Sequence, residues 1–194
     1  MSKRITRAKP KRANAQWIEP LTGVLVVMFV ACFIFLSTSA LVQRMDDETL
    51  QVWFLDIGQG DATLIVTPEG KKILVDAGRD KAVLSKLGSI LPPWDRRLDA
   101  VIITHPDADH ITGFVELFER YQIDQVITTG ATAHSSVVEA LNEVIGAEQT
   151  QVTLVEQGDQ LLFGSVLLNI LWPENTLESV IPDDRNHYSV VFEI

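Results

Sequence analysis

The sequence predicts an α/β (α+β) domain preceded by a single transmembrane helix. Residues 20–43 carry no charge and are mostly apolar, and about 20 apolar residues suffice to cross the hydrocarbon core of a bilayer. After this stretch, strand-like runs first follow one another and then alternate with helical patterns, which favours a mixed sheet with helices packed outside. Of the 194 residues, 46% are hydrophobic, enough for one domain with a substantial core.

The N-terminal part is divided into a basic tail (1–16), an anchor (17–43) and a short linker (44–49). The tail holds six basic residues and no acidic one, whereas acidic residues follow the anchor directly. The positive-inside rule therefore predicts a single-pass cell membrane protein with a cytoplasmic N-terminus and an extracytoplasmic domain. The alternative is a cleaved signal peptide, because Thr-Ser-Ala at 38–40 is loosely similar to a small-residue cleavage site.

From residue 50 onward, β-branched and apolar runs between turn residues predict strands, and apolar residues at helical spacing predict helices. The predicted strands cover residues 50–55, 62–67, 72–75, 99–104, 125–129, 152–155, 160–163, 166–171 and 189–194. The predicted helices cover residues 81–91, 111–121 and 136–145, the last opened by a capping box of Ser136 and Glu139. The last strand has no terminating signal, so we expect the domain (50–194) to be incomplete at its C-terminus.

Charge and cysteine content narrow the chemistry of the domain. From Met45 onward, acidic residues outnumber basic ones by 25 to 9, which argues against tight non-specific DNA binding by the domain alone. A nucleic-acid substrate stays compatible, because bound divalent metals reverse the local field. The single cysteine, Cys32, lies in the apolar stretch, so a metal site in the domain must use imidazole and carboxylate groups.

Four side chains that can bind metals lie within six residues, in the sequence Thr-His-Pro-Asp-Ala-Asp-His-Ile-Thr-Gly at 104–113. They are His105, Asp107, Asp109 and His110. The segment follows a predicted buried strand and precedes a predicted helix, where α/β sheets usually hold their sites. We therefore predict a metal site here; the alternative is a polar turn in which Asp109 caps the helix.

Three motifs in this order resemble the metallo-β-lactamase superfamily. They are Phe-Leu-Asp-Ile-Gly-Gln-Gly-Asp-Ala at 54–62, Ile-Leu-Val-Asp-Ala-Gly at 73–78, and the segment 104–113. Within the superfamily the likeness is strongest to the C-terminal hydrolase domain of ComEC/Rec2-type competence proteins, whose Asn-rich segment is similar to Arg-Asn-His-Tyr-Ser-Val-Val at 185–191. The resemblance implies a metallo-β-lactamase-like αββα sandwich, of which the chain holds the N-terminal part.

The resemblance also implies a site for up to two divalent metals. His105 and Asp107 would belong to the first metal, and Asp109 and His110 to the second. The superfamily usually has a histidine at the position of Asp107, and the carboxylate there shifts the preference from Zn toward Mn or Mg. The cofactor expected is therefore Zn or Mn, and His187 is a further candidate ligand.

A supporting set of residues surrounds this motif in the sequence. Asp76 is implied to orient the metal loop, with an Asx-type turn as the alternative. Glycines in these motifs are expected to permit tight backbone geometry. The full supporting or structural set is Asp56, Gly58, Gly60, Asp61, Asp76 and Gly78.

The function expected is a membrane-anchored, extracytoplasmic, metal-dependent hydrolase of the phosphodiesterase or nuclease type, related to DNA-uptake proteins. Its partners would be the membrane, a nucleic acid or other phosphodiester, and a partner chain that completes the fold. The superfamily completes its site with a later aspartate and a later histidine. Neither residue has a match in the sequence up to Ile194. The alternative is therefore a truncated, catalytically silent metal-binding or interaction module; a lactamase or thioesterase shares the implied fold.

Overall fold

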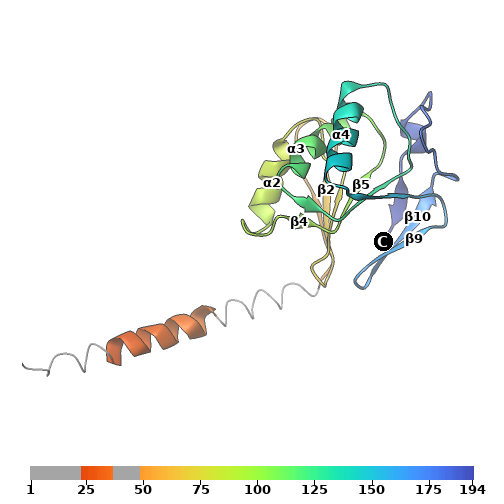
Figure 1. Ribbon diagram of the computed structural model, residues 1–194. Coiled ribbons are helices and arrows are strands. Elements are labelled where there is room, and N and C mark those ends of the chain that lie inside the picture. The colour runs from red at the N-terminus through yellow and green to blue at the C-terminus, as the bar shows by residue number, and fades with distance from the viewer. Residues whose placement is uncertain (1–22, 37–48) are drawn as a thin grey trace, which may run out of the picture. The chain divides into compact units, whose positions relative to one another are not determined.

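The computed structural model of the chain describes residues 23–36 and 49–194 (Figure 1). Contacts divide the chain into two units, residues 1–46 and 47–194. Residues 23–36 form a helix within the predicted anchor, whereas the rest of that anchor, the basic tail and nearly all of the linker lie outside the described residues. In the described ranges, no helix combines the length and apolar character that crossing a bilayer requires.

The second unit is built on a six-stranded sheet with the order β1-β2-β3-β5-β7-β8. Its strands are β1 (Gln51–Phe54), β2 (Thr63–Val66), β3 (Lys72–Val75), β5 (Ala100–Ile103), β7 (Gln125–Thr128) and β8 (Gln151–Leu154). The first three strands pair antiparallel, and β3, β5, β7 and β8 pair parallel. All four residues of β5 are buried, as expected for a parallel strand with both faces covered.

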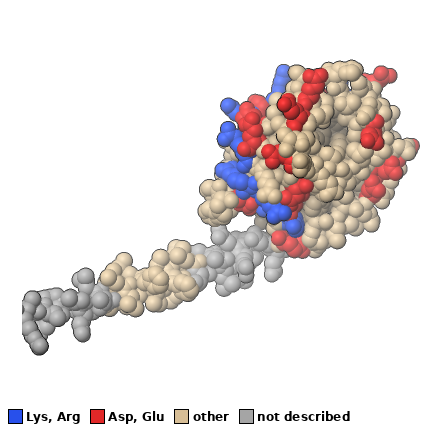
Figure 2. Space-filling model, in the orientation of Figure 1, with Lys and Arg blue, Asp and Glu red and all other residues tan. Residues whose placement is uncertain are grey.

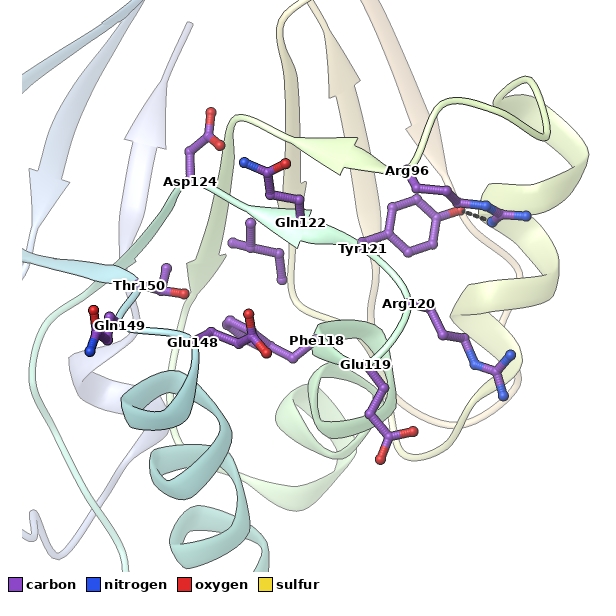
Figure 3. A pocket seen from close by; sticks show the side chains of 11 residues that line it. Arg96, Phe118, Glu119, Arg120, Tyr121, Gln122, Asp124, Glu148, Gln149 and Thr150 are labelled. Atoms are coloured by element: carbon purple, nitrogen blue, oxygen red, sulfur yellow. Dashed lines mark hydrogen bonds between the residues drawn. The ribbon is translucent and has the colours of Figure 1, made fainter.

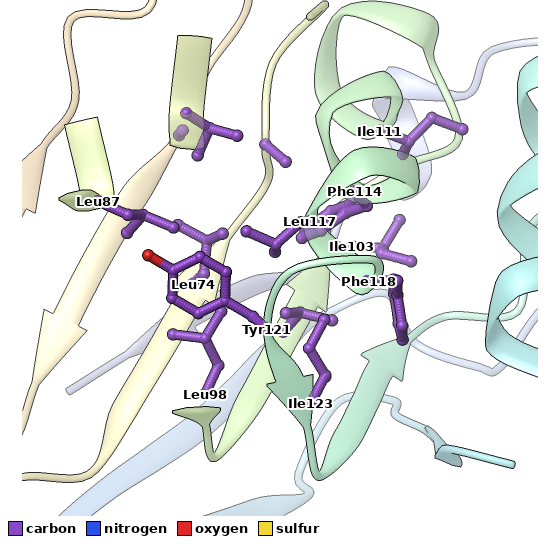
Figure 4. Packing of buried hydrophobic residues seen from close by; sticks show 14 of the residues in the cluster. Leu74, Leu87, Leu98, Ile103, Ile111, Phe114, Leu117, Phe118, Tyr121 and Ile123 are labelled. Atoms are coloured by element: carbon purple, nitrogen blue, oxygen red, sulfur yellow. The ribbon is translucent and has the colours of Figure 1, made fainter. Parts of the chain in front are cut away.

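Three helices cover one face of this sheet: α2 (Ala82–Ile90), α3 (Ala108–Phe118) and α4 (Ser136–Ala147) (Figure 1). The core between them and the sheet includes Phe114 and Leu117 of α3, Leu87 of α2 and Leu74 of β3, all fully buried (Figure 4). Burying an apolar side chain of this size contributes about 1.5–3 kcal/mol, so the helices are held mainly by this face.

A second sheet covers the other face of the first. It consists of β9 (Gln160–Phe163), β10 (Val166–Trp172) and β11 (Val191–Glu193), paired antiparallel in the order β11-β10-β9. Its inner residues Leu168 and Ile170 join Ile73 and Ile102 of the first sheet in one buried cluster. The layers are therefore helices, large sheet and small sheet, which agrees with the mixed α/β architecture expected from the sequence.

Several element boundaries differ from the prediction. The helix expected at 111–121 begins at Ala108, because its polar first turn carries no apolar periodicity. The N-cap of α4 is Ser135 rather than Ser136, and its hydroxyl accepts a hydrogen bond from the Val138 N–H (3.2 Å). The strand expected at 189–194 is confined to β11, and a 3₁₀ turn, η2 (Asn186–Tyr188), precedes it.

Two short strands were not predicted. β4 (Arg97–Leu98) and β6 (Gln122–Ile123) pair parallel as a separate two-stranded sheet. Each has two residues, too few for a period-2 pattern to be visible in the sequence.

On the face of the second unit drawn in Figure 2, the visible basic side chains gather on the side of α2, and acidic side chains are spread over the whole face. Several basic groups are paired: Lys71 with Asp99 (2.8 Å) and Arg97 with Asp124 (2.7 Å). Each of these pairs offsets the positive charge of its own basic side chain.

Candidate functional site

The histidine loop, residues 104–110, joins the carboxyl end of β5 to the first turn of α3. Sites in sheets with parallel strands usually form at this end of the strands. Asp107 is the N-cap residue of α3, with φ −85° and ψ 144°, but its side chain makes no capping hydrogen bond. Asp109 lies in the first helical turn, so the polar-turn alternative was wrong about the capping residue. The Asp107 carboxylate is thus available to other partners.

A buried carboxylate, Asp76, ties the end of β3 to the histidine loop. Its Oδ1 accepts a hydrogen bond from the Thr104 backbone N–H (2.9 Å), and its Oδ2 accepts one from the Thr104 hydroxyl (2.6 Å). Oδ2 also lies 2.8 Å from His110 Nδ1. The backbone of Asp76 has a φ of 56°, a left-handed conformation that aspartate tolerates better than most residues. These bonds reach the loop rather than the neighbouring backbone, so they fix the orientation of the His110 ring.

The hydrogen-bond network assigns the same tautomer to both histidines of the loop. The hydroxyls of Thr104 and Ser189 donate to Asp76 and to the Asn186 carbonyl, respectively. Both hydroxyls can therefore only accept from His105 Nδ1, which lies 2.9 Å from Thr104 Oγ1 and 3.3 Å from Ser189 Oγ. His105 Nδ1 then carries the proton, and its Nε2 keeps a lone pair.

His110 Nδ1 is likewise the donor, because its partner Asp76 is a carboxylate. The rings of His105 and His110 are stacked at a tilt, with centroids 4.0 Å apart. Burial of the ring, followed by the nearby His110, lowers the pKa of His105. The hydrogen bond to Asp76 raises the pKa of His110. Two histidines with Nε2 lone pairs thus lie in contact at one loop.

The segment 185–190, which the sequence analysis used only for its resemblance, lies against the histidine loop. The Val190 N–H donates to the Thr104 carbonyl (3.0 Å). Arg185 Nε forms an ion pair with Asp107 Oδ1. Sequence reasoning missed Arg185 and Ser189 as site residues, because the sequence carries no local signal for a contact between such distant segments.

His187 lies in the same segment but makes different contacts. Its ring packs edge-on against Trp172 and Tyr188, with centroid distances of 5.4 and 5.0 Å. Its backbone carbonyl accepts a hydrogen bond from the Trp172 indole (2.5 Å). Among the contacts of the described residues, none joins His187 to the histidine loop, so the structure does not bring this candidate ligand to the other four.

Two glycines of the supporting set allow close approach of the backbone. Gly60 has a φ of 94°, and a Cβ there would lie 1.8 Å from the carbonyl oxygen of Asp109. Gly78 has a φ of 71°, and a Cβ there would lie 2.1 Å from Ile57 Cδ1. The glycine loop around residue 60 therefore packs directly on the first turn of α3, as only glycine permits.

The remaining supporting residues differ in their distance from the site. The side chain of Asp56 is 94% exposed, and its nearest charged partner is Lys86 (3.8 Å). Asp61 is close enough for its charge to help raise the pKa of His110. Gly58 has a φ of 82°, with open space around it, so its role is confined to the turn.

The donor chemistry of the histidine loop fits a divalent cation. Imidazole nitrogen and carboxylate oxygen are ligands for zinc, and carboxylate also suits manganese. Within residues 23–36 and 49–194, however, no three His, Cys, Asp or Glu side chains converge as a group that could hold a metal ion. The loop thus supplies the donors, but they are not gathered around one point.

Two cavities lie near these elements. One, of about 470 Å³, lies between α3, α4 and β7, and Pro106 of the histidine loop lines it together with apolar residues such as Ile111 and Leu141. The other, of about 730 Å³, is drawn in Figure 3 and includes Arg96 and Tyr121, whose hydroxyl accepts a hydrogen bond from Arg96 (2.7 Å). No residue of the histidine loop lines the larger cavity, so it is a separate feature of the surface.

Comparison with protein families and curated proteins gives three matches. Residues 55–140 match the model of the metallo-beta-lactamase superfamily. The chain is 26% identical over 158 residues to ComE operon protein 3 of Bacillus subtilis (strain 168), covering 73% of this chain and 20% of that protein. It is 36% identical over 106 residues to Recombination protein 2 of Haemophilus influenzae, covering 52% of this chain and 13% of that protein. The chain thus spans a fifth or less of the length of these relatives.

Solved structures give weaker matches. A metallo-beta-lactamase mutant from Cronobacter sakazakii matches with a TM-score of 0.45 and 20% identity, covering 62% of this chain and 50% of that chain. The metallo-beta-lactamase fold protein YhfI of Bacillus subtilis matches with a TM-score of 0.43 and 22% identity, covering 64% of this chain and 50% of that chain.

Proposed function

Residues 55–140 belong to the metallo-β-lactamase superfamily, and from this premise we propose that the chain is a metal-dependent hydrolase that cleaves phosphodiester bonds. It is distantly related to competence proteins of the ComEC/Rec2 type. The observation that carries the proposal is the shared tautomer of His105 and His110, in which both Nδ1 atoms donate and both Nε2 atoms keep a lone pair. A histidine that donates one ring N–H to a fixed oxygen is the usual arrangement of a metal ligand.

Four side chains would hold the metal ions. His105 and Asp107 are assigned to one ion, and Asp109 and His110 to the other. The lowered pKa of His105 favours its neutral form, the form of imidazole that binds a metal, whereas the hydrogen bond to Asp76 raises the pKa of His110. The carboxylates favour manganese as well as the zinc that the superfamily typically binds.

The residues around these donors have separate tasks in the proposed reaction. When bound, two divalent cations would supply Lewis acidity toward the phosphoryl group and an activated water. Asp76 accepts the hydrogen bond from the proton-bearing Nδ1 of His110 and so leaves Nε2 free for a metal ion. Thr104 and Ser189 do the same for His105. Gly60 lets the glycine loop close over the first turn of α3.

The name of one relative favours a phosphodiester as the substrate class. This relative is named for recombination, a process that acts on nucleic acid. The net negative charge of the domain argues for a substrate that is bound through metal ions rather than through a basic surface. Lactam and thioester substrates stay alternatives within the same superfamily.

We also propose an extracytoplasmic location for the domain, with the uncharged stretch 20–43 as the membrane anchor. The charge asymmetry across this stretch supports it, because six basic residues precede it and acidic residues follow it.

A metal-free interaction module is the second candidate function. The ion pair between Arg185 and Asp107 favours it, because this pair already engages a carboxylate that a metal would need. In that case the histidine loop would serve only the fold.

Hydrolysis of bis-p-nitrophenyl phosphate tests the proposed function. The full chain is assayed with added Mn²⁺ or Zn²⁺, beside a His105→Ala/His110→Ala variant and a His134→Ala control, whose histidine is exposed and outside the loop. We expect metal-dependent turnover in the wild type and the control, and a loss of at least about 100-fold in the double variant. Turnover that is equal in all three proteins, or absent from all, would contradict the proposal.

A further inference from the structure

A turn between α2 and β4, residues 92–95, holds a tryptophan out of the second unit; we name it the tryptophan turn. The Asp95 N–H donates to the Pro92 carbonyl (2.9 Å) and closes the turn, and the proline in its second position has the fixed φ that such turns favour. Lys72 Nζ pairs with Asp95 Oδ2 (3.0 Å), which ties the turn to the start of β3. Trp94 is 83% exposed, so a well-fixed turn presents its indole to the surroundings instead of packing it on the fold.

The tryptophan turn lies at the end of the large sheet where the domain begins. Gln51 of β1 pairs with Val66 of β2, and Val66 pairs with Lys72 of β3. The first residues of β1 and the lysine that holds the turn are therefore at the same end of the sheet. Because β3 and β5 run parallel, the histidine loop, which follows the carboxyl end of β5, lies at the opposite end.

Basic side chains border the tryptophan turn. Lys71 and Arg97 are 47% and 59% exposed, and each pairs with an aspartate. Arg96 enters none of the ion pairs among the described residues; its Nη1 donates to the Tyr121 hydroxyl (2.7 Å), and its guanidinium lies 5.1 Å from the centroid of that ring. An exposed indole beside such a cation suits the interface of a bilayer, where tryptophan is enriched and anionic lipids attract basic groups.

We propose that the tryptophan turn docks on the lipid bilayer, with the Trp94 indole at the level of the headgroups and Arg96 near lipid phosphate. The inference rests on the proposed membrane anchor and not on the hydrolase activity. The linker (44–49) spans at most about 20 Å when fully extended, so the membrane surface is within reach of this end of the domain. The histidine loop then faces away from the bilayer, toward a substrate in solution.

Quenching of tryptophan fluorescence by brominated lipids tests the docking. The full chain, which has four tryptophans, is reconstituted in vesicles of phosphatidylcholine and phosphatidylglycerol, with or without bromine in the upper part of the acyl chains. The fluorescence lost to bromine is measured per protein molecule. Trp94→Phe should reduce this loss by about half, because Trp17 at the start of the anchor would supply the rest. Trp172→Phe is the matched control and should leave the loss unchanged, because the Trp172 indole donates to the His187 carbonyl in the segment against the histidine loop.

Flotation of the same vesicles on a density gradient separates the docking from the anchor. If the chain floats and Trp94→Phe leaves the loss of fluorescence unchanged, the docking is overturned while the anchor stands; a protein partner at the turn would also give this result. If the wild-type chain does not float with the vesicles, the anchor and the docking are overturned together. Neither outcome alters the test of hydrolysis, which needs no vesicles.

Discussion

Asp76 is the residue on which the candidate site depends most. It is 3% exposed and binds Thr104 twice and His110 once, which joins the end of β3 to the histidine loop. The sequence suggested such a role only through resemblance, since an aspartate before a glycine turn has an equally good local explanation. The network of hydrogen bonds distinguishes the two, because all three of these bonds leave the turn.

Replacing Asp76 with Asn should lower the pKa of His110. The hydrogen bond to the Asp76 carboxylate is the largest cause of the raised value, and a neutral amide removes the charge. NMR titration of the metal-free protein measures this change. Asp124→Asn, which breaks the pair with Arg97 elsewhere, is the control and should leave the His110 titration unchanged; an unchanged His110 in Asp76→Asn would contradict the assigned pair.

The pair of Asp76 and His110 makes the stability of the fold depend on pH. A folded-state pKa above the ordinary histidine value of 6.5 means that the pair stabilises the fold below that pH. This contribution is lost as the pH rises through the raised pKa of His110. The wild type and Asp76→Asn differ in free energy of unfolding, and His110 contributes part of this difference. That part should shrink as the pH rises from 6.5 through the raised pKa of His110. Urea unfolding at a series of pH values measures it. A gap that widens with rising pH would contradict the sign of this linkage.

At the scale of elements, α3 is held close to the turn after β3. Gly113 in its middle would place a Cβ 2.1 Å from the Ala77 carbonyl oxygen, and the Gly113 N–H donates to the Gly78 carbonyl (3.1 Å). The apolar pattern predicted this helix but not its first turn, because residues 108–110 are not buried in the core. Long buried runs such as β5 were predictable, whereas the pairing of β4 with β6 depends on distant segments.

Gly113→Ala should destabilise the protein although alanine favours helices. The clash with the Ala77 carbonyl outweighs the gain in helix propensity of about 1 kcal/mol, and we expect a net loss of about 1–3 kcal/mol. Urea unfolding measures the free energy. Gly88→Ala in α2 is the matched control: it meets no atom within 4 Å and should stabilise by about 0.5–1 kcal/mol. Two variants of equal stability would disprove the close packing.

At the scale of the whole molecule, the second unit brings its site together from segments far apart in the chain. The glycine loop, the turn at Asp76, the histidine loop and the segment at Arg185 meet at the carboxyl ends of β3 and β5. The resemblance implied that Asp76 orients the histidine loop and gave the glycines a supporting or structural role. The fourth was not predicted, because its contact with Asp107 follows from the placement of β11 beside β10.

The proposed topology is also a property of the whole chain. Protease added outside intact spheroplasts should digest the domain that follows Arg44, because the basic tail is retained in the cytoplasm. Immunoblotting against the domain measures the loss, with a cytoplasmic protein as the control for leakage. Full protection of the domain in intact spheroplasts, with digestion after permeabilisation, would reverse the orientation.

Metal content is the most direct test of the central claim that the histidine loop is a metal site. Elemental analysis of the purified full chain after incubation with Mn²⁺ or Zn²⁺, and removal of the excess, should find about one to two metal ions per chain in the wild type and in His134→Ala. The His105→Ala/His110→Ala variant should retain almost none. A wild-type chain without metal, or a double variant with unchanged metal content, would contradict the account.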